Sequence, residues 1–385
     1  AAVMARAGWP GALNPAEWAA LGFTVWQAVL SAVFSGLLAI PVARALARRQ
    51  FWGRNALVLL MGAPFILPVI VAVLGLLAVF GRAGMLNILL GSLGLPHVQI
   101  YGIHGVVLAH VFFNLPLATR LLLQGWEAIP AERFRLAEAL GMKPKDILRF
   151  LEWPMLKERL PGAFLVIFLI CLSSFAVALT LGGGPKATTL ELAIYQAFRL
   201  EYNLGRAAVM ALLQLVLVLG AGVLALRLTA GAGFGSGLSR KGARQHVSGP
   251  WLKLQDGLVL ALAAGFVGMP LLMVIWRGLL PILSLPVSVW KAAGTSLILA
   301  FSSTVLCLVA AFFLAASRRG WAELTGLLGL AISPLVLGTG WFILINPFYN
   351  PTLFTLPVTV LVNALMALPF ALRVVAPEYA RVESA

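Results

Sequence analysis

The sequence predicts an all-α fold, a polytopic bundle of transmembrane helices. Hydrophobic residues make up 61% of the 385 residues and charged residues only 11%, whereas a soluble domain usually carries about 25% charged residues. The apolar residues gather in long runs, and a run of about 17 to 25 of them is long enough to cross the bilayer core as a helix. Composition and run length together exclude a soluble globular protein.

Nine apolar runs are predicted to span the membrane. They lie near residues 21–43, 56–80, 103–123, 161–181, 207–226, 257–275, 292–316, 324–344 and 356–372. None of them contains Asp or Glu, so the sequence shows no carboxylate relay of the kind that proton- or sodium-driven carriers use. Because the number of spans is odd, and because the chain starts without an initiator Met and ends without a closing element, we expect a piece trimmed at both ends.

The positive charges predict the orientation of the spans. The formal net charge is +15, and the cytoplasmic loops of membrane proteins carry the excess of Lys and Arg. If the first run descends into the cytoplasm, most of the 28 Lys and Arg residues fall on that side. The charge is therefore attributed to topology, and no nucleic acid partner is expected. Cys171 and Cys307 lack ligand spacing, so we expect two small core hydrophobes and no metal site.

Three features of the first part of the chain recur in the second, which predicts two homologous halves. Arg48-Arg49, Pro68 and the stretch 115–120 recur as Arg318-Arg319, Pro334 and the stretch 368–373. Between them lies a basic segment rich in Gly and Ser, which is typical of a flexible linker. We expect a first half at residues 1–227, a cytoplasmic linker at 228–256 and a second half at 257–385.

The stretch from Gln124 to Pro161 is polar enough to leave the membrane, and it predicts two short helices joined by a turn. Pro130 suits the first turn of a helix, and Gly141 suits the left-handed conformation that ends one. Pro144 then begins the second helix. In the first helix Phe134, Ala137 and Leu140 share one face, so that one side can dock while the charged side stays in water.

A second interpretation of this stretch is a helix that lies on anionic headgroups, because basic amphipathic helices next to a membrane often do so. Acidic residues weaken such an attraction, and the stretch carries six of them, at Glu127, Glu132, Glu138, Asp146, Glu152 and Glu158. The mixed charge favours a protein partner.

The loop that follows the fourth run is predicted to lie outside the cytoplasm. Its three consecutive glycines and Pro185 force a turn, after which a Thr can cap a short helix. We expect Lys186, Thr188, Thr189 and Glu191 to mark a docking or substrate-entry site. The alternative is that the loop only supports the bundle, and the sequence leaves both open.

His110 and Asn114 lie one helical turn apart inside the third run. Polar pairs within a helix bundle most often form hydrogen bonds between helices. They are also the candidates for residues of a translocation path, and both interpretations are kept.

Taken together, these residues resemble the permease subunits of ATP-binding-cassette importers. The cytoplasmic signature of that family is Glu-Ala-Ala, three residues, Gly, nine residues, then Ile-x-Leu-Pro. Here Gly141 matches the glycine, Ala137 the second alanine, and the stretch Leu151 to Pro154 falls at the correct distance. The first two positions depart from the pattern, being Arg135 and Leu136, although a glutamate follows at Glu138.

The resemblance implies a fold, partners and a coupling site. The fold would be that of a type I importer permease, fed by a periplasmic binding protein and driven by a separate cytoplasmic ATPase, a homodimer. The polar stretch would insert into a groove on this ATPase through Arg135, Ala137, Glu138, Gly141, Leu151 and Pro154. The chain itself would lie in membrane lipid, hold no cofactor and catalyse no reaction.

Two fused halves narrow the resemblance to the iron(III) and thiamine permeases, and the loop 181–197, with the stretches 110–116 and 149–154, looks most like the bacterial thiamine permease. That likeness implies thiamine or its phosphates as substrate, with iron(III) or another small solute as the alternative. Members have six spans in each half, so the first span and the last two would be missing. An ion-coupled secondary carrier is a more remote alternative for the function. A membrane enzyme would need paired catalytic groups at one membrane depth, and the sequence offers only isolated histidines.

Overall fold

The computed structural model describes residues 14–184, 187–229, 249–317 and 334–383, and every regular element in these ranges is a helix. The predicted fold class, an all-α polytopic bundle, is confirmed. In chain order, the first helices are α2 (Pro15–Arg48), α3 (Arg54–Leu60), α4 (Ala63–Ile66), α5 (Val69–Phe80), α6 (Met85–Ser92) and α7 (Ile103–Glu127).

The middle of the chain holds shorter elements. These are α8 (Ala131–Ala139), α9 (Pro144–Ile147), the π-helix η1 (Leu148–Glu152), α10 (Trp153–Leu172), α11 (Ala176–Leu181) and α12 (Leu190–Arg199). The remaining elements are α13 (Leu204–Thr229), α14 (Pro250–Leu279), the 3-10 helix η3 (Ile282–Ser284), α15 (Val287–Ala316), α17 (Pro334–Ile345), the 3-10 helix η4 (Pro351–Phe354) and α18 (Thr355–Glu383).

Seven segments of the described chain are long and apolar enough to cross a membrane. They are Pro15–Arg48, Val69–Ser92, Ile103–Glu127, Leu204–Leu224, Pro250–Leu279, Val287–Ala316 and Thr352–Leu372. The predicted span at 56–80 differs, because Pro68 interrupts the helix and the apolar segment begins at Val69. The predicted span at 161–181 is broken between α10 and α11. The predicted span at 324–344 lies outside the described residues as far as residue 333.

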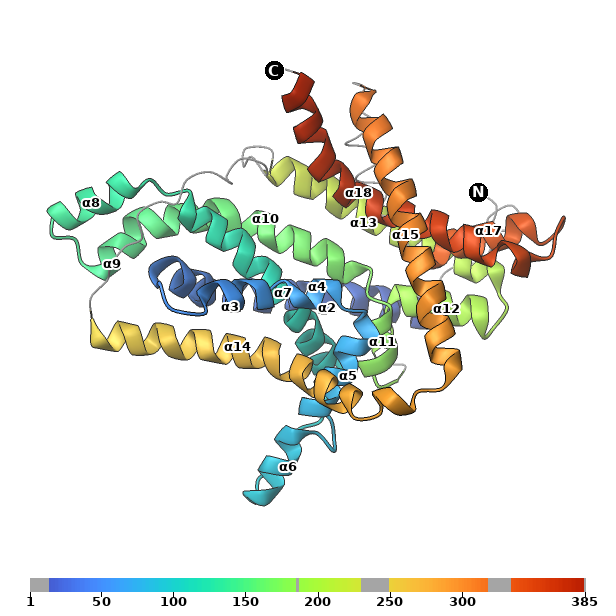
Figure 1. The fold of residues 1–385 in the computed structure, drawn as a ribbon, viewed down its shortest axis with the longest axis horizontal. Coiled ribbons are helices and arrows are strands. Elements are labelled where there is room, and N and C mark those ends of the chain that lie inside the picture. The colour runs from blue at the N-terminus through green and yellow to red at the C-terminus, as the bar shows by residue number, and fades with distance from the viewer. Residues whose placement is uncertain (1–13, 185–186, 230–248, 318–333, 384–385) are drawn as a thin grey trace. The chain divides into compact units, whose positions relative to one another are not determined.

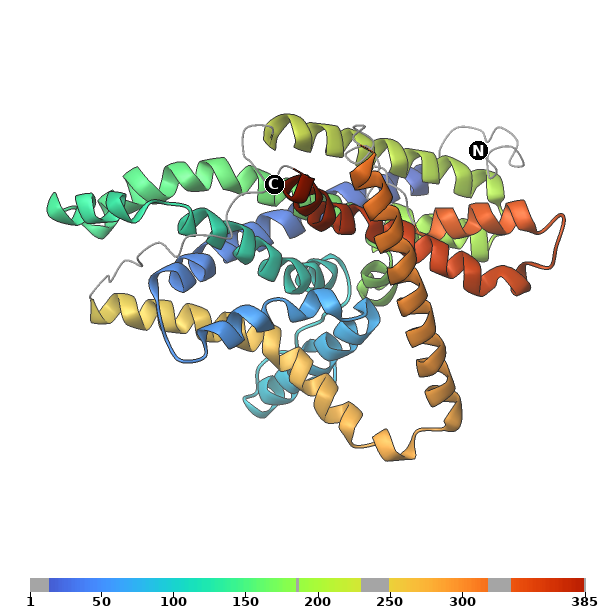
Figure 2. The same ribbon diagram turned by 45° about the horizontal axis from the view of Figure 1, so that its top comes forward.

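The structure forms two compact units, and they divide the chain differently from the predicted halves. One unit joins residues 19–189 to residues 224–280, and the other joins residues 1–18, 190–223 and 281–385. Helix α14, which was expected to open the second half, packs against α5 and α3 within the first of these units (Figures 1 and 2). Of the predicted linker, residues 228–229 and 250–256 are helical, and residues 230–248 lie outside the described chain.

Helix α7 forms the centre of the unit that contains residues 19–189, because both its faces are covered. Phe112 of α7 is fully buried with Leu76 of α5 and Leu181 of α11. Phe266 of α14 packs edge-on against Phe112, with 6.0 Å between the ring centroids.

The other unit has a smaller core where α15 packs against α18, through residues that include Ala311, Leu368 and Leu372. One of the two cysteines, Cys307, lies in this core, and Cys171 lies in α10 of the first unit. Both are buried, as predicted from their positions in apolar runs, and their thiols are free.

Helices α5 and α14 approach each other closely at a glycine. A Cβ atom on Gly75 would lie 2.6 Å from the carbonyl oxygen of Pro270 and 3.0 Å from a methyl carbon of Val274. A Cβ atom does not approach a carbonyl oxygen as closely as 2.6 Å, so a larger residue at this position must push the two helices apart. The absence of a side chain at Gly75 is therefore what permits this packing.

We predict that Gly75→Ala lowers the stability of the protein, because overpacking a close contact costs about 1–3 kcal/mol. Gly265→Ala in α14 is the matched control, since a Cβ there meets no atom within 4 Å and Ala is favoured over Gly in a helix by about 1 kcal/mol. Thermal unfolding in detergent can be followed with a thiol-reactive dye, because both cysteines are buried. Equal midpoints for the two variants would contradict the predicted clash.

Candidate functional site

The predicted helix–turn–helix is present between the end of α7 and α10. Gly141 has φ +67°, and its N–H donates to the carbonyl of Glu138 at 2.9 Å while that of Met142 donates to Ala137 at 2.9 Å. This pair of bonds is the usual glycine-ended stop of a helix. Helix α9 then begins at Pro144, and the Lys143 N–H donates to the Asp146 carboxylate at 3.0 Å. Pro130 caps α8 from just outside the helix rather than occupying its first turn.

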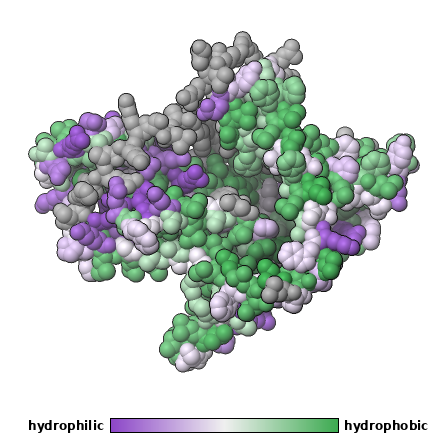
Figure 3. All heavy atoms as spheres, in the orientation of Figure 1, coloured by the Kyte–Doolittle hydropathy of each residue, from purple (hydrophilic) through white to green (hydrophobic). Residues whose placement is uncertain are grey.

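The predicted docking face of α8 is only partly buried. Ala137 is buried at 2% exposure, whereas Leu140 is 69% exposed. Four large apolar side chains of this region reach solvent, and we call them the coupling surface: Leu136, Leu140, Phe150 and Trp153. Charged residues surround them, and Figure 3 shows hydrophilic residues gathered over the end of the unit where α8 and α9 lie.

The six residues predicted to couple this segment to a partner occupy different environments. Arg135, Glu138, Gly141 and Pro154 are exposed, Leu151 is half-buried, and Ala137 faces inward. An exposed apolar group of this kind, bordered by charges, is typical of a surface that binds another protein.

The base of the segment is held by an ion pair that the sequence analysis did not identify. Glu152 ends η1 and is buried at 1% exposure. Nη2 of Arg44 lies 2.6 Å from its Oε2, and Nη2 of Arg48 donates to its Oε1 at 3.4 Å. Both arginines belong to α2 and lie one turn apart. A signal was present in the sequence, namely two cations at helical spacing and one acid inside the closing signature.

A buried polar network lies deeper in the same unit. His110 of α7 forms two hydrogen bonds through its ring, at 3.1 Å from Nδ1 to Ser31 Oγ and at 2.8 Å from Nε2 to Ser174 Oγ. Ser31 belongs to α2, and Ser174 lies in the break between α10 and α11. All three side chains are buried. The imidazole therefore joins three elements of the bundle.

Asn114 and Gln27 extend this network. The Asn114 amide donates to the His110 carbonyl at 2.8 Å and to Cys171 Sγ at 3.3 Å, while the Gln27 amide donates to the Cys171 carbonyl at 2.7 Å. His110 and Asn114 thus make the contacts between helices that one interpretation of the sequence expected. Neither lines a cavity described below, and their part in a translocation path stays a prediction.

The loop that was predicted to lie outside the cytoplasm is held by hydrogen bonds to the rest of its unit. Gly183 and Gly184 have φ of +73° and +133°, and the Gly102 N–H donates to the Leu181 carbonyl at 2.8 Å. Thr189 is fully buried, and its hydroxyl donates to the Ser174 carbonyl at 2.7 Å. This hydrogen bond links the loop to the break between α10 and α11, where the Ser174 hydroxyl also bonds to His110.

Two of the four residues predicted to form a docking or entry site are internal. Thr189 and Glu191 are 0% and 2% exposed, and the Gln214 amide of α13 donates to the Glu191 carboxylate at 3.5 Å. Both side chains face the interior because their polar groups bond within their own units, so neither is open to a docked protein. Thr188 is half-buried, and Lys186 lies outside the described residues.

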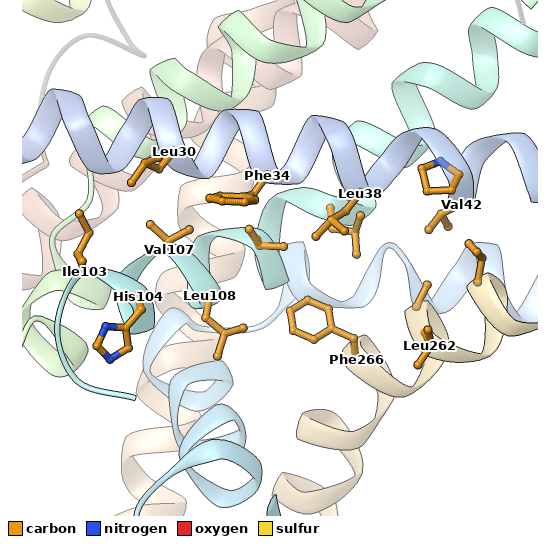
Figure 4. Close-up of a pocket in the computed structure, with 15 residues that line it drawn as sticks. Leu30, Phe34, Leu38, Val42, Ile103, His104, Val107, Leu108, Leu262 and Phe266 are labelled. Carbon is orange, nitrogen blue, oxygen red and sulfur yellow. The ribbon is translucent and has the colours of Figure 1, made fainter. Parts of the chain in front are cut away.

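An apolar cavity of about 620 Å³ lies between α2, α7 and α14. Figure 4 shows Phe34 and Leu38 of α2 on one side and Val107, Leu108 and Phe266 on the other. His104 supplies the one imidazole among its lining residues. A charged or strongly polar solute would find almost no hydrogen-bonding partner there, so this cavity does not support a substrate site.

A second cavity, of about 670 Å³, is more polar and lies beside the glycine loop. Arg82, Gln99, Tyr101 and Gly183 are among its lining residues. The guanidinium of Arg82 lies over the Tyr101 ring, 5.5 Å from its centroid. The described residues contain no group of three or more His, Cys, Asp or Glu that could hold a metal ion.

Comparison with known proteins identifies relatives along nearly the whole chain. It is 44% identical over 373 residues to the thiamine transport system permease protein of Escherichia coli (strain K12), covering 93% of this chain and 69% of that protein. The permease proteins of the same description from Brucella abortus (strain 2308) and Haemophilus influenzae are 40% and 36% identical, covering 94% and 93% of this chain and 69% of each relative.

A family model points to the same kind of protein. The model described as binding-protein-dependent transport system inner membrane component matches residues 35–231, a range that includes the coupling surface, the Glu152 ion pair, His110 and Asn114. The seven long apolar helices agree with a multi-pass protein of the inner membrane. The chain belongs to the family of binding-protein-dependent transport system inner membrane components, and it is a transport permease subunit.

Proposed function

We propose that this chain is the membrane permease of an ATP-driven importer that passes thiamine, or its phosphate esters, from a periplasmic binding protein into the cytoplasm. The observation that carries the proposal is the 36–44% identity, across more than nine tenths of the chain, to thiamine transport permeases of several bacteria. The helix–turn–helix with its exposed coupling surface supports the ATP-driven part.

We propose that the coupling surface binds a cytoplasmic ATPase homodimer. Leu136, Leu140, Phe150 and Trp153 offer apolar and aromatic anchors that a groove could bury, which is how a short helix usually binds a partner. Arg135 and Glu138 flank these anchors, where charges direct partner choice more than they add affinity. Ala137 and Leu151 pack inward and hold the segment in shape.

The first prediction from this proposal concerns the substrate and the energy source. The full-length permease, reconstituted in vesicles with its ATPase and binding protein, should take up labelled thiamine only when ATP is supplied. Unlabelled thiamine should compete, and iron(III) should not. Uptake should survive a protonophore while ATP is held constant, because the predicted spans contain no Asp or Glu that could relay protons. Loss of uptake with the proton gradient, at constant ATP, would favour an ion-coupled carrier instead.

The second prediction concerns the turn at Gly141. A Cβ there meets no atom within 4 Å, so a substitution acts only through the backbone, which a residue other than Gly adopts at a cost of about 1–2 kcal/mol. Gly141→Val should lower uptake roughly 5- to 30-fold, the factor that corresponds to this free energy.

Gly141→Asn is the matched control, because Asn tolerates the left-handed conformation far better than a β-branched residue does. It should retain most of the uptake. If both variants transport equally well, the shape of this turn does not matter for coupling.

The third prediction concerns the extracytoplasmic loop, which we propose receives the binding protein. The loop borders the cavity that Arg82 and Tyr101 also line. At its start, the Leu181 carbonyl accepts a hydrogen bond from the Gly102 N–H. A bulky thiol-reactive label on Lys186→Cys should weaken docking of the binding protein and leave ATPase association intact. The native Cys171 and Cys307 are buried, so labelling is selective. Undisturbed docking, measured with ATPase association on the same sample, would mean that the loop only braces the bundle.

A further inference from the structure

The end of α2 and the start of α3 contact both ends of the coupling segment, by which we mean α8, α9 and η1 between α7 and α10. Arg44 and Arg48 contact Glu152, where η1 ends and α10 begins. Arg54 donates to Glu127, the last residue of α7, at 3.4 Å. The end of α2 therefore contacts the point where the chain enters α10, and the start of α3 contacts the point where it leaves α7.

These two contacts differ in strength. Glu127 is about half exposed, with 47% of its side chain accessible, and ion pairs in water contribute little. Glu152 has 2% of its side chain accessible and lies 2.6 Å from Arg44. In a dry environment the attraction between opposite charges is larger, and removing one partner leaves an uncompensated buried charge. The link through Glu152 is the stiffer one.

The Glu152 site is not arranged for stability alone. Two cations of α2 face one carboxylate, and within the described part of the chain neither Nε of Arg44 nor that of Arg48 has a hydrogen-bond partner. Although it lies 2.6 Å from Arg44 Nη2, Glu152 Oε2 accepts no well-aligned hydrogen bond. A buried ion pair with unfilled hydrogen bonds is a costly way to gain stability, since an apolar contact of similar volume often stabilises more.

The backbone at this point is also unusual. Leu148–Glu152 form a π-helix, in which the turn holds one residue more than in an α-helix. Such turns are rare and are frequent at functional sites. Glu152 is the last residue of this π-helix, so the carboxylate that meets α2 belongs to the unusual turn itself.

We infer that Glu152 is a positioning residue through which a displacement of the coupling segment is carried to α2, with Arg44 and Arg48 as the receiving groups. The inference rests on the proposed function, because it presumes that an ATPase moves this segment. The spanning part of α2 carries Gln27 and Ser31, which bond to α10 and to His110 of α7. A shift of α2 would therefore reach the buried network of the bundle.

The test compares uptake per ATP hydrolysed in the full-length complex. Glu152→Gln keeps the shape of the side chain and removes its charge. Thiamine-stimulated ATP hydrolysis should persist, while uptake per ATP falls roughly 5- to 100-fold, the usual range of coupling between two sites. Glu201→Gln is the matched control, since Glu201 also pairs with an arginine, Arg206 at 3.1 Å, but is about half exposed. Its ratio should stay at the wild-type value.

Two further variants keep the result decisive if Glu152→Gln does not fold. Glu152→Asp retains the charge but shortens the side chain by one methylene, and it should lower uptake per ATP below the wild-type value while ATP hydrolysis persists. The double variant Arg44→Glu and Glu152→Arg, in which the two charges change places, should recover most of the uptake per ATP that each single change loses.

The outcomes separate the possible failures. If the wild-type complex shows no ATP-driven uptake, the proposed function is wrong and the inference with it. If the wild type transports, and the Glu152 variants lower the unfolding temperature but leave uptake per ATP unchanged, Glu152 only stabilises the fold and the inference is overturned.

Discussion

Within a bilayer, the backbone N–H and C=O groups have no water to bind and must find partners inside the protein. This constraint makes every regular element of the described chain a helix, and it governs the places where helices stop. Between α10 and α11 the Ser174 carbonyl accepts a hydrogen bond from Thr189, while the Ser174 hydroxyl bonds to His110. The polar side chains within the spans thus compensate for a break that the membrane would otherwise penalise.

The same requirement explains the hairpin that follows α5. The amide of Asn87 in α6 donates to the carbonyls of Gly81 and Val98, each at 2.9 Å, and its oxygen accepts from the Val98 N–H at 2.8 Å. One side chain, 2% exposed, therefore satisfies three backbone groups from both arms of the hairpin. A polar residue in an apolar segment marks a break in the backbone here, as His110 does deeper in the bundle.

The end of the bundle that holds Arg44, Arg48 and Arg49 follows a different rule, because charges outside the apolar spans can meet either water or one another. Arg49 donates to Asp256 of α14 at 2.7 Å, while Arg44 and Arg48 meet Glu152. The arginines at and just after the end of α2 thus connect this helix to the start of α10 and to α14. The helix–turn–helix between α7 and α10 is thereby attached to the bundle at a defined place.

The sequence by itself determined the features that depend on neighbouring residues. Long apolar runs predicted the helical class, and Pro130, Gly141 and Pro144 predicted the helix–turn–helix, because helix ends and left-handed glycines are local properties. The breaks near Pro68 and Ser174 were missed, since hydropathy continues through them. The tertiary structure alone decided that α14 packs on α5 and that Glu152 meets Arg48, 104 residues away. It also decided that Thr189 and Glu191 are internal, because burial depends on contacts distant in the chain, which periodicity and composition do not encode.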